Sequence, residues 1–146
     1  MGSKREALRD AGLLWLRLLM GACIATHGYS KLFGGHFDEF KTGVAAMNLP
    51  GFSPEHWAML AAWSEFAGGI FLMMGLATRV AAFLIFCTMT VAVFRVHWAD
   101  PFDVKELGLA YWTMAAALAL TGGGRFSIDA ALLSHFGRGA GGGAKL

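Results

Sequence analysis

The sequence has few charged residues, few cysteines and few prolines. Charged side chains make up 15% of the 146 residues, whereas about 25% is usual in soluble domains. A soluble globule of this size needs a polar surface, and so few charges do not supply one. Hydrophobic residues make up 56% of the chain and the mean hydropathy is +0.53. The composition excludes a disordered chain and most soluble enzymes, and it indicates an integral membrane protein.

The cysteine count and the charge balance exclude further classes. Two cysteines are too few for a disulfide scaffold, and a net charge of +2 is too small to indicate nucleic-acid binding. Cys23 and Cys87 lie in separate apolar stretches without C-x-x-C spacing, which favours small core residues over a redox centre. The histidines also lack the paired spacing of a metal site on one helix, so we expect no bound metal.

Four apolar stretches are long enough to cross a bilayer core of ~30 Å, which takes about 20 residues. They cover approximately residues 11–33, 57–76, 80–98 and 105–121. Ser53 and Pro54 predict the start of the second helix, and Thr78 is the expected cap of the third. The sequence therefore predicts an all-α protein, an integral membrane four-helix bundle.

The bundle is expected to form a single domain over residues 1–136, followed by a disordered Gly-rich tail over residues 137–146. Basic residues gather on the side that carries both termini and the turn between the second and third spans. They are Lys4, Arg5, Arg9, Arg79, Arg125, Arg138 and Lys145. The positive-inside rule then places both termini in the cytoplasm.

Two short amphipathic helices are expected outside the spans. Apolar residues recur at spacings of three and four in the first outer loop, at Phe37, Phe40, Val44 and Met47. Such a helix lies on the membrane surface as a connector, or covers the mouth of the bundle as a lid. Ser127 can cap a second surface helix after the fourth span. Its apolar residues are Ile128, Leu132, Leu133 and Phe136.

Several ionisable residues lie inside the predicted spans, where a charge costs at least about 2.5–3.5 kcal/mol at the helix centre. Glu65 lies about 12 Å below the outer end of its span, at ~1.5 Å per residue. It shares one stripe with Gly68 and Gly69, whose small size lets a neighbouring helix approach closely. We therefore expect Glu65 to face a packed neighbour rather than lipid.

Five residues are expected to converge in the outer half of the bundle, namely His27, Lys31, Glu65, Arg95 and His97. His27 and Glu65 are the pair expected to exchange protons, because imidazole and carboxylate groups do so near neutral pH. The alternative is a purely structural ion pair, in which the Glu65 carboxylate pairs with Arg17, His27 or Arg95.

Each of the basic residues also has a purely structural interpretation. Arg17 lies much deeper than the others, and it either snorkels to the cytoplasmic surface or forms a structural ion pair with Glu65. Lys31 and Arg95 lie near the water interface, where charges also mark helix ends. His97 can serve as an interface anchor.

Motifs along the chain resemble those of one family. They are His27-Gly28-x-x-Lys31-Leu32-Phe33, Glu65-x-x-Gly68-Gly69, Gly75-Leu76-x-Thr78-Arg79, His97 after the third span, and Gly124-Arg125-Phe126-Ser127-Ile128-Asp129. In this order, over roughly residues 11–133, they resemble the DoxX family of small bacterial membrane proteins. Gly123 stands where many relatives have proline, which loosens the turn and puts no chemistry in doubt.

The resemblance implies a multi-pass protein of the bacterial cytoplasmic (inner) membrane. Some members of this family are membrane subunits of thiosulfate:quinone oxidoreductase, so the resemblance implies an auxiliary redox role, commonly linked to a quinone. Glu65 and His27 would then bind a quinone and relay protons to its oxygen. The other expected ligand-binding residues are Lys31, Arg95, His97, Trp63, Gly68 and Gly69.

Two alternatives stand beside this function. The chain can be a non-catalytic membrane anchor or assembly subunit for a soluble oxidoreductase, or a carrier of small molecules. The sequence shows no haem, flavin or iron–sulfur ligation, so electrons would come from another protein. The expected partners are the lipid bilayer, a soluble or membrane oxidoreductase and a second copy of the chain, but not nucleic acid.

Overall fold

The computed structural model describes residues 2–140 and the side chains of residues 3–135. This part of the chain contains helices and no β-strand, which confirms the all-α prediction. The helices are α1 (Gly2–Phe33), α2 (Phe37–Ala46), α3 (Pro54–Met74), α4 (Thr78–Val91), α5 (Phe102–Thr121) and α6 (Ile128–Ala140). A π-helical segment, η1 (Ala92–Val96), continues directly from α4.

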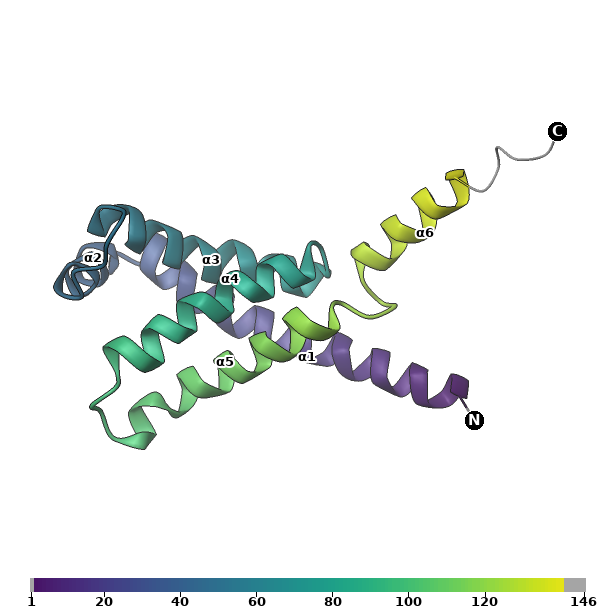
Figure 1. Ribbon diagram of the computed structural model, residues 1–146, viewed down its shortest axis with the longest axis horizontal. Coiled ribbons are helices and arrows are strands. Elements are labelled where there is room, and N and C mark those ends of the chain that lie inside the picture. Colours follow the sequence, from purple (N-terminus) through teal and green to yellow (C-terminus); the bar gives the residue numbers. More distant parts are fainter. Residues whose placement is uncertain (1, 141–146) are drawn as a thin grey trace.

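The long helices pack side by side in a consistent order. Helix α1 packs along α3, α3 packs against α4, and α4 packs against α5, which also contacts α1. The short helix α2 covers one end of this arrangement, and α6 projects from the opposite end, where the N-terminus lies (Figure 1). The buried core between the long helices is apolar. It includes Met20, Ile24, Leu72, Ile85 and Leu118.

Two of the described segments are long and apolar enough to cross a membrane, Pro54–Met74 and Thr78–Val96. They correspond to the second and third predicted spans. Helices α1 and α5 lie where the first and fourth spans were predicted, but they carry more charged residues than α3 and α4. Lys31 lies in the last turn of α1, and Asp103 lies in the first turn of α5.

The helix boundaries follow local sequence signals in α3 but not in α4. The Ser53 side chain accepts a hydrogen bond from the backbone N–H of His56, and Gly75 ends α3 with φ +67°. Thr78 was predicted to cap α4, but it is the first residue of the helix and its side chain makes no capping hydrogen bond. The carboxylate of Asp129 instead accepts hydrogen bonds from the backbone N–H groups of Ala77 and Thr78, at 2.7 and 2.8 Å.

Small residues allow α1 and α3 to approach closely. A Cβ atom on Gly28 would lie 2.3 Å from the backbone nitrogen of Phe66, and a Cβ on Gly69 would lie 2.6 Å from the carbonyl oxygen of Gly21. Gly68 faces the other side, where a Cβ would lie 3.3 Å from the side chain of Ile85 on α4. Gly68 and Gly69 therefore set the spacing between helices.

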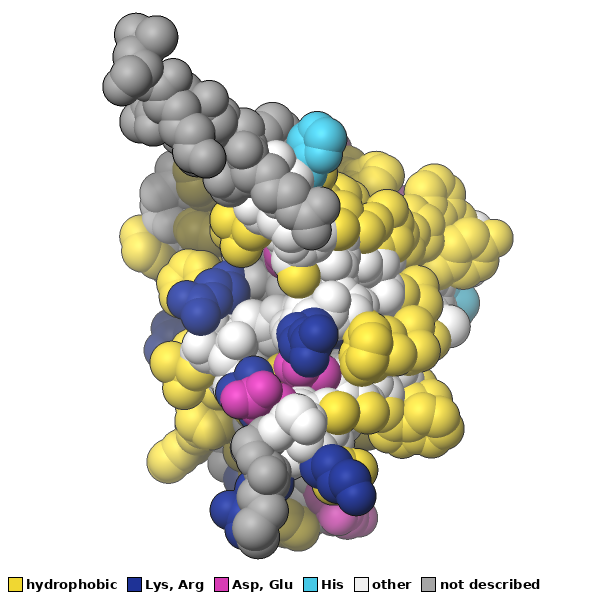
Figure 2. Space-filling view, turned by 90° about the vertical axis from the view of Figure 1, so that its right-hand side faces the viewer, with side chains coloured by type: hydrophobic (Ala, Val, Ile, Leu, Met, Phe, Trp, Pro, Cys, Tyr) yellow, Lys and Arg dark blue, Asp and Glu magenta, His cyan; other side chains and the backbone are white. Residues whose placement is uncertain are grey.

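The end of the molecule that carries the N-terminus holds several basic and acidic side chains, with hydrophobic side chains beside them (Figure 2). Asp10 is buried there and accepts a hydrogen bond from the backbone N–H of Arg125. The backbone N–H of Asp129 donates to the carbonyl oxygen of Gly75 at 2.9 Å. These contacts join α1, the turn between α3 and α4, and the start of α6.

The two amphipathic helices expected outside the spans are α2 and α6. Val44 of α2 is buried, which confirms the apolar side of this helix. Helix α6 continues to Ala140 and so includes residues 137–140, which the sequence assigned to the Gly-rich tail. The rest of that tail, residues 141–146, and the side chain of Phe136 lie outside the described residues.

Candidate functional site

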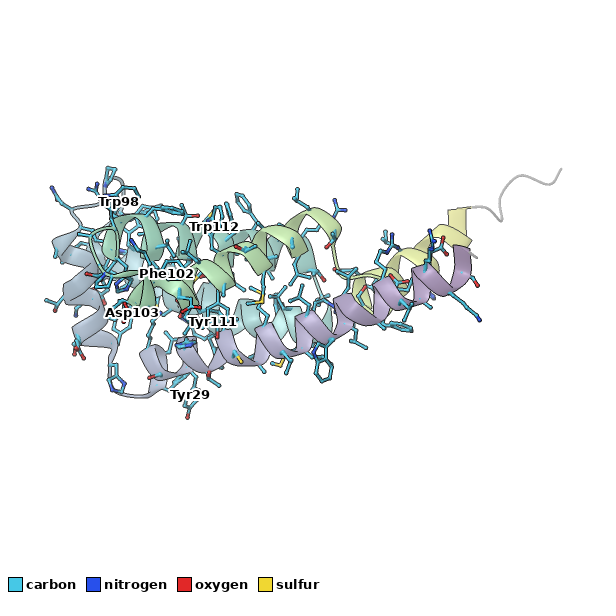
Figure 3. All side chains as sticks on the ribbon, turned by 90° about the horizontal axis from the view of Figure 1, so that it is seen from below. Tyr29, Trp98, Phe102, Asp103, Tyr111 and Trp112 are labelled. Carbon is cyan, nitrogen blue, oxygen red and sulfur yellow. The ribbon has the colours of Figure 1, made fainter. Side chains whose placement is uncertain are left out.

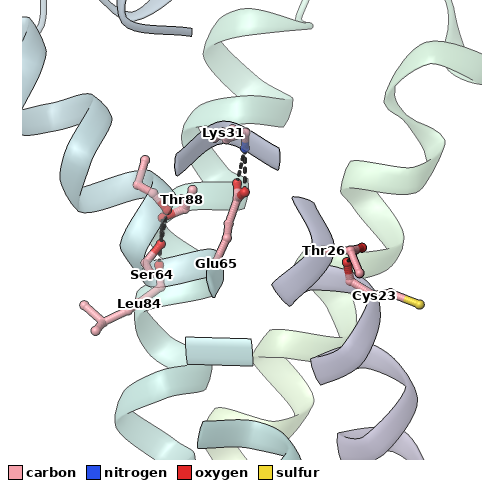
Figure 4. A network of polar contacts seen from close by, with 8 residues as sticks. Cys23, Thr26, Lys31, Ser64, Glu65, Leu84 and Thr88 are labelled. Atoms are coloured by element: carbon pink, nitrogen blue, oxygen red, sulfur yellow. Dashed lines mark hydrogen bonds and ion pairs between the residues drawn. The ribbon is translucent and has the colours of Figure 1, made fainter. Parts of the chain in front are cut away.

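An ion pair between α1 and α3 lies at the centre of the candidate site. The Nζ atom of Lys31 donates to both carboxylate oxygens of Glu65, at 2.6 and 2.5 Å (Figure 4). The Glu65 side chain is 1% exposed and that of Lys31 is 25% exposed. A buried carboxylate needs such a partner, because an uncompensated charge in an apolar surrounding costs several kcal/mol. Glu65 does pair with a basic residue of a neighbouring helix, but that residue is Lys31 and not one of the candidate partners Arg17, His27 and Arg95.

Helix α2 covers this ion pair. The Lys31 ammonium lies 4.6 Å from the ring centroid of Phe40, which is a favourable cation–π distance. On another side of α2, Lys41 donates to Asp38 at 2.8 Å and lowers the pKa of that carboxyl. The helix therefore presents an aromatic ring to the ion pair and keeps an ionised pair of its own outside it.

The first of two cavities at the ion pair lies between α2, α3 and α4; we call it the apolar cavity. It has a volume of about 180 Å³. Its walls are mostly hydrophobic, and they include Phe40, Val44, Leu60 and Val91. The polar part of its wall includes Lys31, Glu65, Ser64, Thr88, Cys87 and Trp57. A concave, mostly apolar space with a few polar groups is the usual form of a small-molecule site.

Most polar groups in this wall already have partners. The hydroxyls of Ser64 and Thr88 lie 2.6 Å apart (Figure 4), and each also lies within hydrogen-bond distance of a carbonyl oxygen, that of Ala61 at 2.8 Å and that of Leu84 at 3.1 Å. The indole nitrogen of Trp57 differs, because it is buried and has no hydrogen-bond partner among the described residues.

The second cavity lies on the other side of the ion pair, between α1, α4, η1 and α5; we call it the polar cavity. Its volume is about 200 Å³. His27, His97, Lys105 and Tyr111 line it together with Lys31 and Glu65. The Tyr111 ring points from α5 towards α1, where it meets the His27 ring edge-on at 5.8 Å (Figure 3). The Lys31–Glu65 pair therefore forms part of the wall of both cavities.

The π-helical turn η1 forms part of the wall of both cavities. Ala92 lines both of them, and the backbone N–H of His97 donates to its carbonyl at 3.0 Å. The wider turn changes the register of the residues that follow. His97 reaches the polar cavity and pairs with Asp100 at 2.7 Å. Arg95 instead points to the carbonyl of Met47, at 3.5 Å, and lines neither cavity.

The structure brings together four of the five residues expected to converge. His27, Lys31, Glu65 and His97 all line the polar cavity. Within the described part of the chain, no hydrogen bond joins His27 to Glu65, and Lys31 donates to both carboxylate oxygens. His27 therefore lies beside the ion pair rather than in it.

Three other expected ligand-binding residues have different positions. Trp63 is 44% exposed and packs its ring against Phe33 and Phe66, outside both cavities. Gly68 and Gly69 pack against α4 and α1, as described above, because their missing side chains leave room for those helices.

Arg17 is fully buried and lies far from the ion pair. Its guanidinium donates to the carbonyl oxygens of Phe126, at 2.6 Å, and Leu72, at 3.4 Å. It therefore neither snorkels to the surface nor pairs with Glu65. The loop before α6 folds over the guanidinium of Arg17 and supplies an acceptor, the carbonyl of Phe126. The sequence alone could not place this carbonyl near Arg17.

Sequence patterns do not single out some of these residues. The unpaired N–H of Trp57 emerges only from the packing around it. Ser64 and Thr88 are ordinary residues of apolar helices until their hydroxyls meet. Among the described residues, no group of three or more His, Cys, Asp or Glu side chains is placed to hold a metal ion.

Comparisons with known proteins agree with the motifs along the chain. A family model described as DoxX matches residues 12–98. The chain is 30% identical to "Inner membrane protein YqjF" of Escherichia coli over 130 residues, which cover 85% of this chain and 94% of that protein. It is 31% identical to "Putative oxidoreductase CatD" of Bacillus subtilis over 123 residues, which cover 82% and 86%. No solved structure is significantly similar to it.

These matches fit the helical fold, the apolar segments and the motif residues around Lys31 and Glu65. The family model spans more than half of the chain, and the similarity to the Escherichia coli protein extends over almost all of that relative. The chain belongs to the DoxX family of membrane proteins.

Proposed function

We propose that this protein binds a quinone in the apolar cavity and serves as an auxiliary redox subunit of the bacterial inner membrane. In this proposal α1, α3, α4 with η1, and α5 all cross the membrane, and both termini lie in the cytoplasm. Large hydrophobic side chains on the outer surface of these helices support a lipid surrounding, among them Trp15, Phe71, Phe83 and Leu120. Basic side chains at the end that carries the N-terminus support the orientation.

The single observation that carries the ligand assignment is the position of the Lys31–Glu65 pair in the wall of the apolar cavity. An engineered apolar cavity of ~150 Å³ binds benzene, so about 180 Å³ is enough for one six-membered ring. Hydrophobic walls suit the faces of the ring, and the ammonium suits a carbonyl oxygen. A quinone head group has both properties.

The residues around the ligand would then have separate tasks. Lys31 donates a hydrogen bond to a ligand oxygen, and Glu65 holds the ammonium in place and can exchange a proton with it. His27 and His97 line the polar cavity on the far side of the pair, where they can exchange protons with water near neutral pH. A bound quinone supplies two-electron chemistry, and its electrons would come from a partner oxidoreductase. The printed name of the Bacillus subtilis relative supports a redox role.

The proposal is tested by binding of duroquinone, a single-ring quinone whose ring carbons carry four methyl groups and do not alkylate thiols. The protein is purified in lipid nanodiscs, and the Kd is measured by calorimetry against empty nanodiscs. We expect Glu65→Gln to weaken binding about 10-fold or more, because the Lys31 ammonium loses the charged hydrogen bonds, about 1.5–3 kcal/mol each, that hold it in place for the ligand oxygen. Lys41→Met is the matched control, since Lys41 pairs with Asp38 outside the cavity.

The double variant Lys31→Met/Glu65→Leu gives a second measurement. It replaces the ion pair with apolar side chains of similar size, so the helices should stay folded while the ligand oxygen loses its donor. Duroquinone binding by the double variant with the same Kd as the unchanged protein would refute the site assignment. Absence of binding to the unchanged protein would refute the proposed function.

A second candidate function is a membrane anchor for a soluble oxidoreductase. Helix α6 favours it, because α6 projects from the end near the N-terminus and exposes Leu132 and Leu133, the latter by 76%. If this surface binds a partner enzyme, Leu132→Ser/Leu133→Ser should abolish co-purification of that enzyme and leave duroquinone binding unchanged. If this variant instead loses duroquinone binding and the partner enzyme still co-purifies, the anchor function is contradicted.

A further inference from the structure

We propose that the indole N–H of Trp57 is a second hydrogen-bond donor for the ligand in the apolar cavity. The site would then recognise a ring that carries two acceptor oxygens on opposite sides, as in a 1,4-quinone. The inference rests on the proposed function and extends it, because it assigns a specificity-determining residue and a pattern of ligand acceptors.

The first observation is the state of the indole nitrogen. Trp57 lines the apolar cavity from the first turns of α3, and its Nε1 atom is buried without a hydrogen-bond partner among the described residues. Buried polar atoms are almost always hydrogen-bonded, and an exception calls for an explanation. A rotation of the indole would turn its N–H towards the cavity, where an acceptor that belongs to a bound ligand would satisfy this donor.

The second observation is that the remaining polar side chains of this wall already have partners. Lys31 and Glu65 bind each other, and Ser64 and Thr88 bind each other and nearby carbonyls. Cys87 has a thiol, which is a weak donor. The Trp57 N–H is therefore the strong donor in this wall that has no acceptor within the described part of the chain.

The third observation is the separation along α3 of Trp57 and Glu65, the residue that holds the Lys31 ammonium. Trp57 precedes Glu65 by about two helical turns, which corresponds to ~12 Å along the helix axis at ~1.5 Å per residue. The indole and the ion pair therefore approach the cavity from different levels of the helix. A ring between them would meet the Lys31 ammonium with one oxygen and the Trp57 N–H with the other. Phe52 packs edge-on against the Trp57 ring at 5.1 Å.

The experiment compares two ligands with the same carbon skeleton and different numbers of oxygens. Duroquinone has carbonyl oxygens at both ends of its ring, whereas 2,3,5,6-tetramethylphenol has the same ten carbons, an aromatic ring and a single hydroxyl oxygen. Each Kd is measured by calorimetry in lipid nanodiscs for the unchanged protein and for Trp57→Phe. Trp63→Phe is the matched control, because Trp63 lies on the same helix outside both cavities.

We expect Trp57→Phe to weaken duroquinone binding about five- to tenfold, the usual effect of one net hydrogen bond. The phenol should bind both proteins equally, because the charged Lys31–Glu65 end is the stronger site for its single oxygen. Without ligand, Trp57→Phe should unfold at the same temperature as the unchanged protein or higher, because the lost N–H had no partner. Trp63→Phe should leave both Kd values unchanged.

Three results would overturn the inference. Equal weakening of both ligands by Trp57→Phe would show that the ring face, rather than the N–H, contacts the ligand. Unchanged duroquinone binding by Trp57→Phe, with binding still weakened by Glu65→Gln, would refute the role of Trp57 and leave the proposed function standing. Absence of duroquinone binding to the unchanged protein would refute both.

Discussion

The carboxylate of Glu65 on α3 receives two hydrogen bonds from the ammonium of Lys31 on α1, at 2.6 and 2.5 Å. The pair links the two helices that pack most extensively and forms part of the wall of both cavities. The contribution of the pair to stability can be separated from its contribution to binding. Removal of Lys31 alone leaves a buried charge without a partner, whereas removal of both residues leaves no such charge but still removes the donor to the ligand.

Lys31→Met alone should lower the free energy of unfolding by about 3–5 kcal/mol, since it leaves Glu65 buried without a partner. The double variant Lys31→Met/Glu65→Leu should recover most of this loss, because no charge remains to be compensated. Unfolding in detergent, followed by circular dichroism, measures both. A single variant as stable as the double variant would show that the carboxylate is hydrated or protonated instead.

The close contact between α1 and α3 predicts a large difference between two glycine substitutions in one helix. Gly28→Ala should destabilise the protein by about 3 kcal/mol, or prevent folding, because its Cβ would lie 2.3 Å from the backbone of Phe66. Gly12→Ala is the control, since nothing lies within 4 Å of a Cβ there. It should stabilise α1 by up to about 1 kcal/mol through helix propensity. Equal melting temperatures for the two variants would contradict the observed packing.

The Asp129 carboxylate caps α4 from 51 residues away in sequence. Asp129→Asn keeps one acceptor oxygen and loses the other, so we expect a loss of about 1 kcal/mol. Asp129→Ala should lose more, because both backbone N–H groups at the start of α4 are then without the carboxylate. Glu39→Gln, on the exposed side of α2, serves as the control. Thermal unfolding measures the series, and an unchanged midpoint for Asp129→Ala would rule out the cap.

Cys87 provides a reporter for occupancy of the apolar cavity, because it lines this cavity and is a free, exposed thiol. In a Cys23→Ser background, saturating duroquinone should slow alkylation of Cys87 by N-ethylmaleimide several-fold. Cys23, tested in a Cys87→Ser background, lines neither cavity and should react at the same rate with and without ligand. Mass spectrometry of the labelled protein gives both rates, and equal protection of the two thiols would place the ligand elsewhere.

Local signals predicted much of the helical framework. The apolar stretch and the Ser53 cap predicted the position of α3, and the spacing of Phe37, Phe40 and Val44 predicted α2. These features depend on neighbouring residues along the chain, so periodicity and capping rules detect them.

The partners of buried polar groups could not be predicted in the same way. Glu65 was expected to have a basic partner, but the choice of Lys31 depends on how a long, flexible side chain reaches across the helix contact. The cap supplied by Asp129 and the carbonyl that binds Arg17 come from the far end of the chain. The free N–H of Trp57 depends on everything packed around it. Such features require the three-dimensional arrangement.

The hydrogen bond between Arg17 and the carbonyl of Phe126 has a consequence for biosynthesis. The two residues are 109 positions apart, so the ribosome adds most of the protein after Arg17 before its acceptor exists. Translation proceeds from the N-terminus, and the nascent chain therefore carries a guanidinium that must remain hydrated, or associated with lipid phosphates, until the last segment arrives. The final packing of α1 is consequently a late, post-translational event. A nonsense mutation shortly before codon 126 would remove the Phe126 acceptor but leave every predicted span intact.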